Sequence, residues 1–201
     1  MRAVKDFVGD QADTYCFVPD EELLGPEQLG RLQRRKLSGL LREVLTSNAF
    51  YKAKLGDLTF DATGDPMAKL PFTTRAELQQ DQQAHPPYGT NLTYPLPRYV
   101  RLHQTSGSSA AGATTRGAPT PLRWLDTAES WAWFKKGWKI IYRAAGVAAS
   151  DRLFFPFSFG PFVGFWAAFE AGCELGNFCL PAGGMTSKAR LRHLLENSVT
   201  V

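Results

Sequence analysis

The sequence contains few cysteines, and none of them lies at a spacing that binds metal. Cys16, Cys173 and Cys179 are the three cysteines of the 201-residue chain, an odd number without a CxxC pair. This pattern argues against a disulfide framework and against a zinc site, and it fits idle thiols in a reducing compartment. The N-terminal residues 1–13 also lack the apolar run of a secretory signal. We therefore expect a cytoplasmic protein without a metal-binding motif.

Long hydrophobic runs are also missing. The most apolar stretch, residues 153–169, is interrupted by Pro156, Gly160, Pro161 and Gly164. It is too short and too broken for a membrane span, which needs about 20 apolar residues. A buried strand, a turn and a buried helix explain it better, so no membrane association is expected.

The chain is mildly basic, with a net charge of +4 and a pI near 9.0. The dense basic run is Arg31 to Lys36, and such a run on a helix is usually a solvated face. Nucleic-acid binding through this helix and exposed aromatic residues is an alternative, but the charge is not concentrated enough to favour it.

Two common catalytic motifs are absent, and a hydroxyl-rich segment stands out instead. Neither the Walker pattern GxxxxGK[ST] nor a GxSxG nucleophile elbow occurs. Residues 103–124, "HQTSGSSAAGATTRGAPTPLRW", crowd Ser, Thr and Gly together. Bare backbone amides flanked by hydroxyls can form a concave donor surface for a phosphate. The alternative interpretation of this composition is a flexible linker.

Hydrophobic spacing predicts helices that alternate with short strands. Pro26 is suited to the first turn of a helix that carries leucines at helical spacing up to Leu45, and Thr74 with Glu77 forms a capping box for a second helix. Asp126 and Glu129 form a further capping signal for a Trp-rich helix that Gly146 closes. We expect strands at residues 98–105, 152–157 and 175–181, further helices at about 161–171 and 186–197, and the start of a strand in "SVTV" at 198–201.

These elements predict an α/β fold in which helices pack on a sheet. We expect a helical N-terminal region with a Pro-rich connector over residues 1–97, and an α/β part with the hydroxyl-rich loop over 98–201. The final "VTV" would leave its backbone pairing unfinished unless it lies in a sheet. We therefore expect the α/β part to be incomplete at its C-terminus and the chain to be a truncated piece of a longer protein.

The order of several motifs resembles the phenylacetate–CoA ligase family of adenylate-forming (AMP-binding) enzymes. "RLHQTSGSS" is similar to the Ser/Thr-Ser-Gly-Thr-Thr-Gly phosphate loop, with Arg101-Leu102-His103 in place of the family's Arg-hydrophobic-His. Further similar segments lie between residues 45 and 201: "NAFYKAKL", "MAKLPFTTRAEL", "YRAAGVAASDRLFFPFSFGPF" and "GCELGNFCLPAGGMTSKARLRHL".

The resemblance implies ATP-dependent activation of a carboxylic acid, with ATP, Mg²⁺ and coenzyme A as cofactors. The acid attacks the α-phosphorus of ATP to give an acyl-adenylate and pyrophosphate, and a thiol then displaces AMP to form a thioester. The fold it implies is part of the large N-terminal domain of such an enzyme.

The resemblance also carries over individual residues. The phosphate loop maps onto Thr105, Ser106, Gly107, Ser108 and Ser109, with His103 just ahead of it. An aryl or other apolar acid is expected at the aromatic-Gly stretch and the Gly-Gly turn, which here are Phe157, Phe159, Gly160, Gly183 and Gly184. Plain core packing is the alternative for the aromatic residues, and buried hydrogen bonding is the alternative for His103. No catalytic residue is assigned.

The chain departs from the family pattern in two respects. Extra residues, "AAGATTRGAPT", follow Ser109, so that Gly112 and Gly117 both compete for the last glycine of the loop. The family's acidic adenine- and ribose-binding motif and its C-terminal domain with a catalytic lysine are not found. We expect the isolated chain to be inactive without the C-terminal part of the enzyme. The expected ligand of the complete enzyme is a small-molecule carboxylic acid, and assembly into a homo-oligomer stays open. A non-catalytic truncated product, at most a nucleotide or partner binder, is the competing hypothesis.

Overall fold

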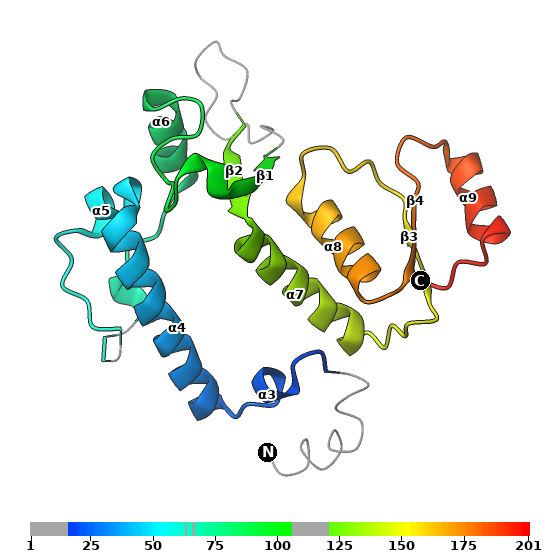
Figure 1. Cartoon of the computed structure of the whole chain (residues 1–201), viewed down its shortest axis with the longest axis horizontal. Helices are drawn as coiled ribbons and strands as arrows, with labels where there is room; N and C mark the ends of the chain where they lie inside the picture. Colours follow the sequence, from blue (N-terminus) through cyan, green and yellow to red (C-terminus); the bar gives the residue numbers. More distant parts are fainter. Residues whose placement is uncertain (1–15, 63, 66, 106–120) are drawn as a thin grey trace. The chain divides into compact units, whose positions relative to one another are not determined.

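The computed structural model describes residues 16–62, 64–65, 67–105 and 121–201, and the structural statements below concern these residues (Figure 1). The chain divides into two compact units. One is Leu24–Ala128, called here the hairpin unit. The other, called the parallel-sheet unit, is Met1–Leu23 together with Glu129–Val201. The expected division between residues 97 and 98 falls inside the hairpin unit.

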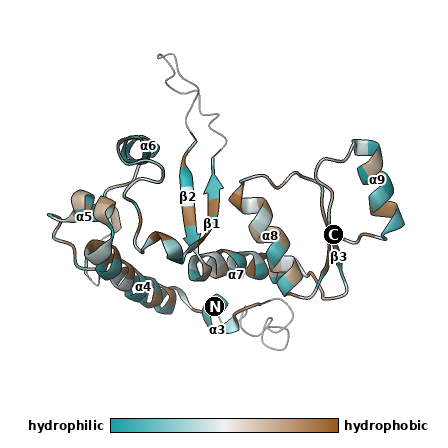
Figure 2. Cartoon of the chain, turned by 45° about the horizontal axis from the view of Figure 1, so that its top comes forward, coloured by the Kyte–Doolittle hydropathy of each residue, from teal (hydrophilic) through white to brown (hydrophobic). Residues whose placement is uncertain are grey.

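Helices form the first part of the hairpin unit. The predicted helix at Pro26 is confirmed as α4 (Pro26–Ser47), and Figure 2 shows hydrophobic and hydrophilic residues alternating around it. Asn48, which is 2% exposed, separates α4 from α5 (Ala49–Leu55). Its side chain accepts a hydrogen bond from Tyr51 N and donates to Asn91 Oδ1 and Thr93 Oγ1 at 3.0 and 3.1 Å. The junction is thus fixed to the connector that precedes the first strand. The remaining short elements are η2 (Met67–Lys69), α6 (Arg75–Ala84) and η3 (Leu96–Arg98).

An antiparallel pair of strands completes the hairpin unit. The predicted strand is confirmed as β1 (Tyr99–Gln104), and it pairs with β2 (Arg123–Thr127). The sequence did not predict β2. Asp126, expected to cap the next helix, instead lies within β2 opposite Arg101. α7 (Ala128–Ala144) begins directly after the strand, so this capping prediction is wrong.

The parallel-sheet unit is built on a strand–helix–strand motif. β3 (Arg152–Phe155) and β4 (Phe178–Pro181) are parallel, and α8 (Val163–Glu174) connects them. The predicted strands and helix are thus confirmed, with shorter strands than expected. The unit also contains the short helix α3 (Pro19–Glu22), most of α7, and α9 (Ser187–Glu196).

A small apolar core holds the parallel-sheet unit together. Leu153 and Phe155 of β3 are 2% and 5% exposed and pack with Ala168 of α8 and Val147. Gly172 of α8 has no room for a side chain, since a Cβ there would lie 2.8 Å from Leu153 Cδ1 and 2.9 Å from Cys179 Sγ. α8 therefore approaches both strands closely.

The predicted strand at 198–201 is not formed as a regular strand, but its backbone pairs with β3. Phe154 N donates to Val201 O at 2.9 Å, and Val201 N donates to Arg152 O at 3.3 Å. This exchange is the pattern of neighbouring parallel strands. The predicted α/β class is confirmed, with two separate two-stranded sheets among the described residues rather than one larger sheet.

The capping box of α6 supplies a first testable prediction. Thr74 Oγ1 accepts from Glu77 N, and the Glu77 carboxylate accepts in return from Thr74 N. Replacing Thr74 by alanine should lower the free energy of unfolding by about 0.5–2 kcal/mol, because an N-terminal amide of the helix loses its acceptor. Urea denaturation measures this change. The control, T59A at an exposed threonine outside the helix, should stay within about 0.5 kcal/mol of the parent. Equal stability of T74A and T59A would contradict the prediction.

Candidate functional site

Two hydrogen bonds between Thr105 and Leu122 hold the ends of the hydroxyl-rich segment together, and this pair is called here the Thr105–Leu122 neck. Thr105 N donates to Leu122 O at 3.0 Å, and Leu122 N donates to Thr105 Oγ1 at 3.0 Å. These two bonds continue the β1–β2 pairing by one step and bring the two ends of the segment together. The Thr105 amide donates within the neck. The hydroxyl hydrogen of Thr105 is therefore the donor that this residue can offer to a ligand.

The helix α6 anchors the second strand beside this neck. Gln82 Nε2 donates to Arg123 O at 2.7 Å, and Arg123 N donates to Gln82 Oε1 at 3.0 Å, so the amide side chain imitates a neighbouring strand. Arg123 Nη1 also donates to Pro87 O at 2.8 Å. Gln82 therefore positions the end of the segment. Sequence reasoning missed this residue, because a glutamine on a polar helix carries no signal of such a role.

The remaining predicted phosphate-loop residues divide between the described strand and the segment beyond it. His103 lies in β1 opposite Trp124 and is only 4% exposed. Ser106, Gly107, Ser108 and Ser109, and the competing Gly112 and Gly117, lie outside the described residues.

The predicted acid-binding aromatic residues form one cluster in the parallel-sheet unit. Phe157 stacks on Phe165 with ring centroids 4.2 Å apart, and Phe159 lies 4.8 Å from Trp166 and 5.2 Å from Phe169. Both Phe157 and Phe159 are partly buried against the core. Much of their ring surface is therefore used in packing. The part that remains exposed, on two rings tilted by 60° to one another, is called here the apolar wall.

The Gly-Gly turn lies directly against this aromatic stretch. A Cβ on Gly183 would lie 2.9 Å from both Phe157 O and Ser158 Cα, so only glycine allows this approach of the two backbones. Gly184 has φ +78°, a conformation that favours glycine. Ala182 N donates to Phe155 O at 2.9 Å, which ties the turn to the end of β3.

The arrangement follows from the parallel pairing of β3 with β4. Because the strands run in the same direction, the segments that follow them, 156–160 and 182–184, emerge at the same edge of the sheet. The carboxyl edge of parallel strands is the usual place for ligands in α/β proteins. The structure thus brings Gly183 close to Phe157, whose ring centroid lies 6.1 Å from that of Phe159, and it places Gly160 and Gly184 in the same two segments.

Among the described residues, large pKa shifts occur at Tyr142, Cys179 and Glu77. Burial raises the pKa of Tyr142 to about 12 and that of Cys179 in β4 to about 12, and hydrogen bonds from Lys54 and Thr74 lower the pKa of Glu77 to about 2. In the described part of the chain, no three His, Cys, Asp or Glu side chains gather closely enough to hold a metal ion. No described helix is long and apolar enough to cross a membrane.

Comparison with known proteins gives one clear sequence relative, while no family model matches the chain. The chain is 27% identical over 177 residues to a phenylacetate–coenzyme A ligase of Thermus thermophilus. The match covers 86% of this chain and 37% of the relative. The chain therefore spans little more than a third of the curated relative.

Solved structures of 2-hydroxyisobutyryl-CoA ligase share the fold. The postadenylation state in complex with R3-HIB-AMP has a TM-score of 0.77 at 19% identity, covering 94% of this chain and 38% of that one. An open conformation in complex with 2-HIB-AMP and CoA has a TM-score of 0.72 at 19% identity, covering 87% and 40%. Both comparisons agree with the resemblance seen in the motifs: the chain is similar in sequence to a phenylacetate–CoA ligase and has the fold of the N-terminal part of an adenylate-forming CoA ligase.

Proposed function

We propose that the chain is the N-terminal portion of an ATP-dependent acid–thiol ligase that activates an aryl or other apolar carboxylic acid. A carboxylate oxygen attacks the α-phosphorus of ATP, and the bond to pyrophosphate breaks. The sulfur of coenzyme A then attacks the acyl carbon, and AMP leaves. The similarity to a phenylacetate–CoA ligase over 86% of the chain is the observation that carries this proposal.

The hydroxyl-rich segment has the chemistry to hold the leaving pyrophosphate. Its two ends, Thr105 and Leu122, are held together at the neck, and this supports a phosphate-binding cradle formed from the segment. The Thr105 hydroxyl and the hydroxyls and amides at residues 106–109 would donate to phosphate oxygens, and Mg²⁺ would offset their charge. His103, buried in β1, would position the strand that leads into this cradle.

The apolar wall at the carboxyl edge of β3 and β4 is suited to the side chain of the acid. Phe157 and Phe159 offer aromatic surface, and Gly160, Gly183 and Gly184 add no side chain at their own positions. Aromatic residues with a few polar neighbours are typical of small-molecule sites. An aryl or alkyl side chain of the acid suits this surface.

A chimera tests the proposed function. Residues 1–201 would be joined to the part of the Thermus thermophilus relative that this chain does not span, and acid-dependent exchange of labelled pyrophosphate into ATP would be measured. We expect exchange with phenylacetate in the presence of Mg²⁺. The 201-residue chain alone should show none, since it spans 37% of that relative.

Two outcomes would decide against the proposal. A folded chimera, judged by circular dichroism and a cooperative thermal transition, that shows no exchange with any of a panel of aryl and alkyl acids would favour a non-catalytic binder. Exchange by the 201-residue chain alone would contradict the need for further segments.

A further inference from the structure

Two cysteines lie close together in the parallel-sheet unit, outside both proposed ligand segments. Cys173 is in the last turn of α8, and Cys179 follows it in β4. We propose that this pair is a thiol-oxidation site, at which a small dissolved disulfide such as glutathione disulfide converts the two thiols reversibly into an internal disulfide bond. The proposal does not rest on the proposed ligase activity.

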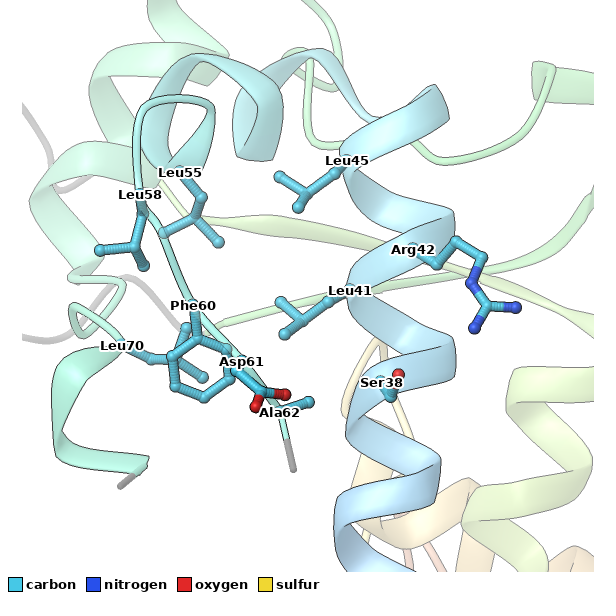
Figure 3. A pocket seen from close by; sticks show the side chains of 10 residues that line it. All are labelled: Ser38, Leu41, Arg42, Leu45, Leu55, Leu58, Phe60, Asp61, Ala62 and Leu70. Carbon is cyan, nitrogen blue, oxygen red and sulfur yellow. The ribbon is translucent and has the colours of Figure 1, made fainter. Parts of the chain in front are cut away.

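Thiol chemistry is confined to the parallel-sheet unit, to which all three cysteines of the chain belong. The hairpin unit has an open hollow, which leucines line together with Ser38, Arg42 and Asp61 (Figure 3). In Figure 3 the guanidinium of Arg42 extends away from these leucines. No thiol is among the residues that line this hollow.

The turn after α8 brings β4 back against the last turn of the helix. Asn177 N donates to Gly172 O at 3.1 Å, and Gly176 N donates to Cys173 O at 3.0 Å. Gly176 has φ +87°, the left-handed conformation that ends many helices with this bonding pattern. Asn177 Nδ2 also donates to Ala148 O at 2.7 Å. The turn between the two cysteines is therefore held by hydrogen bonds on both sides.

The Cys179 side chain is directed from β4 to the part of α8 that carries Cys173. A Cβ on Gly172 would lie 2.9 Å from Cys179 Sγ, so this sulfur contacts the helix one residue before Cys173. The Cys173 thiol is a hydrogen-bonding neighbour of Cys179, and after burial it contributes to the raised pKa of Cys179. Two cysteines whose sulfur atoms already approach each other can be bridged without a large backbone movement.

The two thiols differ in exposure, which sets the order of the reaction. Cys173 is exposed and Cys179 is half-buried, so a dissolved disulfide reaches Cys173 first. Cys173 loses its proton, and its sulfur attacks glutathione disulfide, whose S–S bond breaks so that one glutathione thiolate leaves. Cys179 then gives its proton to the buffer, and its sulfur attacks Cys173 Sγ. The second glutathione leaves, and the two cysteines are joined.

The electrons balance within this exchange. The two cysteines give up two electrons, and the reagent disulfide is reduced to two glutathione thiols. An excess of reduced glutathione reverses both steps. The raised pKa of Cys179 slows the second step. That step takes place between groups held in contact, however, and this proximity gives it a large advantage over attack by a dissolved thiol.

Oxidation of the 201-residue chain tests the site. Cys16→Ser leaves Cys173 and Cys179 as the thiols of the chain. This variant would be incubated with glutathione disulfide at about pH 8, where exposed thiols are partly ionised. Mass spectrometry of acid-quenched, unreduced peptides measures the products. We expect the internal disulfide to exceed the glutathione adduct of Cys173 by at least about tenfold. Excess reduced glutathione should restore both thiols.

Two further variants test whether the position of each thiol matters. In Cys16→Ser/Cys179→Ser, the glutathione adduct of Cys173 should accumulate, because no second thiol displaces it. The matched control, Cys16→Ser/Cys173→Ser/Glu174→Cys, moves the exposed thiol by one residue. The Glu174 carboxylate points to α7, where it lies 2.6 Å from Lys139 Nζ. A thiol at position 174 should therefore keep its glutathione and form no bond with Cys179.

Two results would overturn the assignment of this oxidation site. One is a folded Cys16→Ser chain that accumulates the glutathione adduct of Cys173 without the internal disulfide. The other is a Glu174→Cys control that forms an internal disulfide as readily as the native pair. Circular dichroism before oxidation establishes that each chain is folded. Should Cys16→Ser fail to fold, the native chain gives the same result, because the bridged peptides are identified by mass.

Discussion

Replacing Ser108 and Ser109 together by alanine is expected to slow acyl-adenylate formation by about two to four powers of ten in the chimeric ligase. The resemblance to the phosphate loop implies that both hydroxyls face triphosphate oxygens. Hydrogen bonds to a charged acceptor contribute roughly 1.5–3 kcal/mol each, and about 1.4 kcal/mol is tenfold in rate. Single-turnover formation of acyl-adenylate from ATP and phenylacetate measures the effect.

The control replaces two serines outside the loop. Ser150 and Ser187 are exposed in the parallel-sheet unit, so S150A/S187A should leave the rate unchanged. The S108A/S109A variant should keep its circular dichroism spectrum and thermal midpoint, since its effect is on the transition state. An unchanged rate in the folded S108A/S109A variant would mean that the segment is only a linker.

The extra residues in the segment can be tested by deletion. Removing residues 110–116 leaves Gly117 as the last glycine and restores a family-like loop. If the insertion misplaces the phosphate-binding groups, the deletion should raise the adenylation rate, because catalysis depends on placement within about an ångström. If the insertion is a tolerated lid, the rate should change little. This deletion therefore decides whether the extra residues disturb the loop.

The thiol of Cys179 is expected to react with iodoacetamide at least about tenfold more slowly in the folded chain than in urea. Burial, followed by the neighbouring Cys173, raises the pKa of Cys179 to about 12. Since the thiolate is the nucleophile, the raised pKa lowers the reactive fraction at about pH 8, and the higher intrinsic nucleophilicity of the remaining thiolate offsets part of this loss. Mass spectrometry of timed samples gives the alkylation rate at each cysteine separately.

Cys173 provides an internal control for this experiment. It is exposed at the end of α8, so reagent reaches it in the folded chain. The rate at Cys179 should rise about tenfold per pH unit until the pH approaches its pKa of about 12. By linkage, the stability contributed by the protonated Cys179 is present below its unfolded pKa and is lost as the pH rises toward the folded value. Similar rates at Cys179 in folded and unfolded protein would contradict the burial of this thiol.

Local sequence signals predicted most helices and strands. They did not predict β2, which forms by pairing with another strand of the chain. Pro26 and the Thr74–Glu77 pair mark helix starts by local hydrogen bonding and fixed φ, and the structure has helices at both places. β2 was missed because its pairing with β1 is not encoded in its own residues. Asp126 is a good capping residue in isolation, yet the ladder with β1 holds it in a strand.

The sequence allowed the candidate site residues to be selected, but it did not predict which of them lie close together. Phe157 and Gly183 were selected from motifs that lie far apart in the sequence. Their backbones lie so close that a Cβ on Gly183 would be 2.9 Å from Phe157 O. This approach depends on the parallel register of β3 and β4, which no local sequence pattern predicts. Gln82 and the Thr105–Leu122 neck could not be anticipated for the same reason. A hydrogen bond between a side chain and a backbone atom far away in the sequence produces no periodic pattern of residues.

The β3–α8–β4 motif also bears on how the parallel-sheet unit can form. The buried core residues Val147, Leu153, Phe155 and Ala168 all lie within a short stretch of the chain. Contacts between residues that are close in sequence have a low entropic cost of loop closure, and domains rich in them fold quickly. This part of the chain can therefore reach its packed state soon after β4 leaves the ribosome. The carboxyl edge of β3 and β4, where Gly183 approaches Phe157, would be assembled at the same early stage.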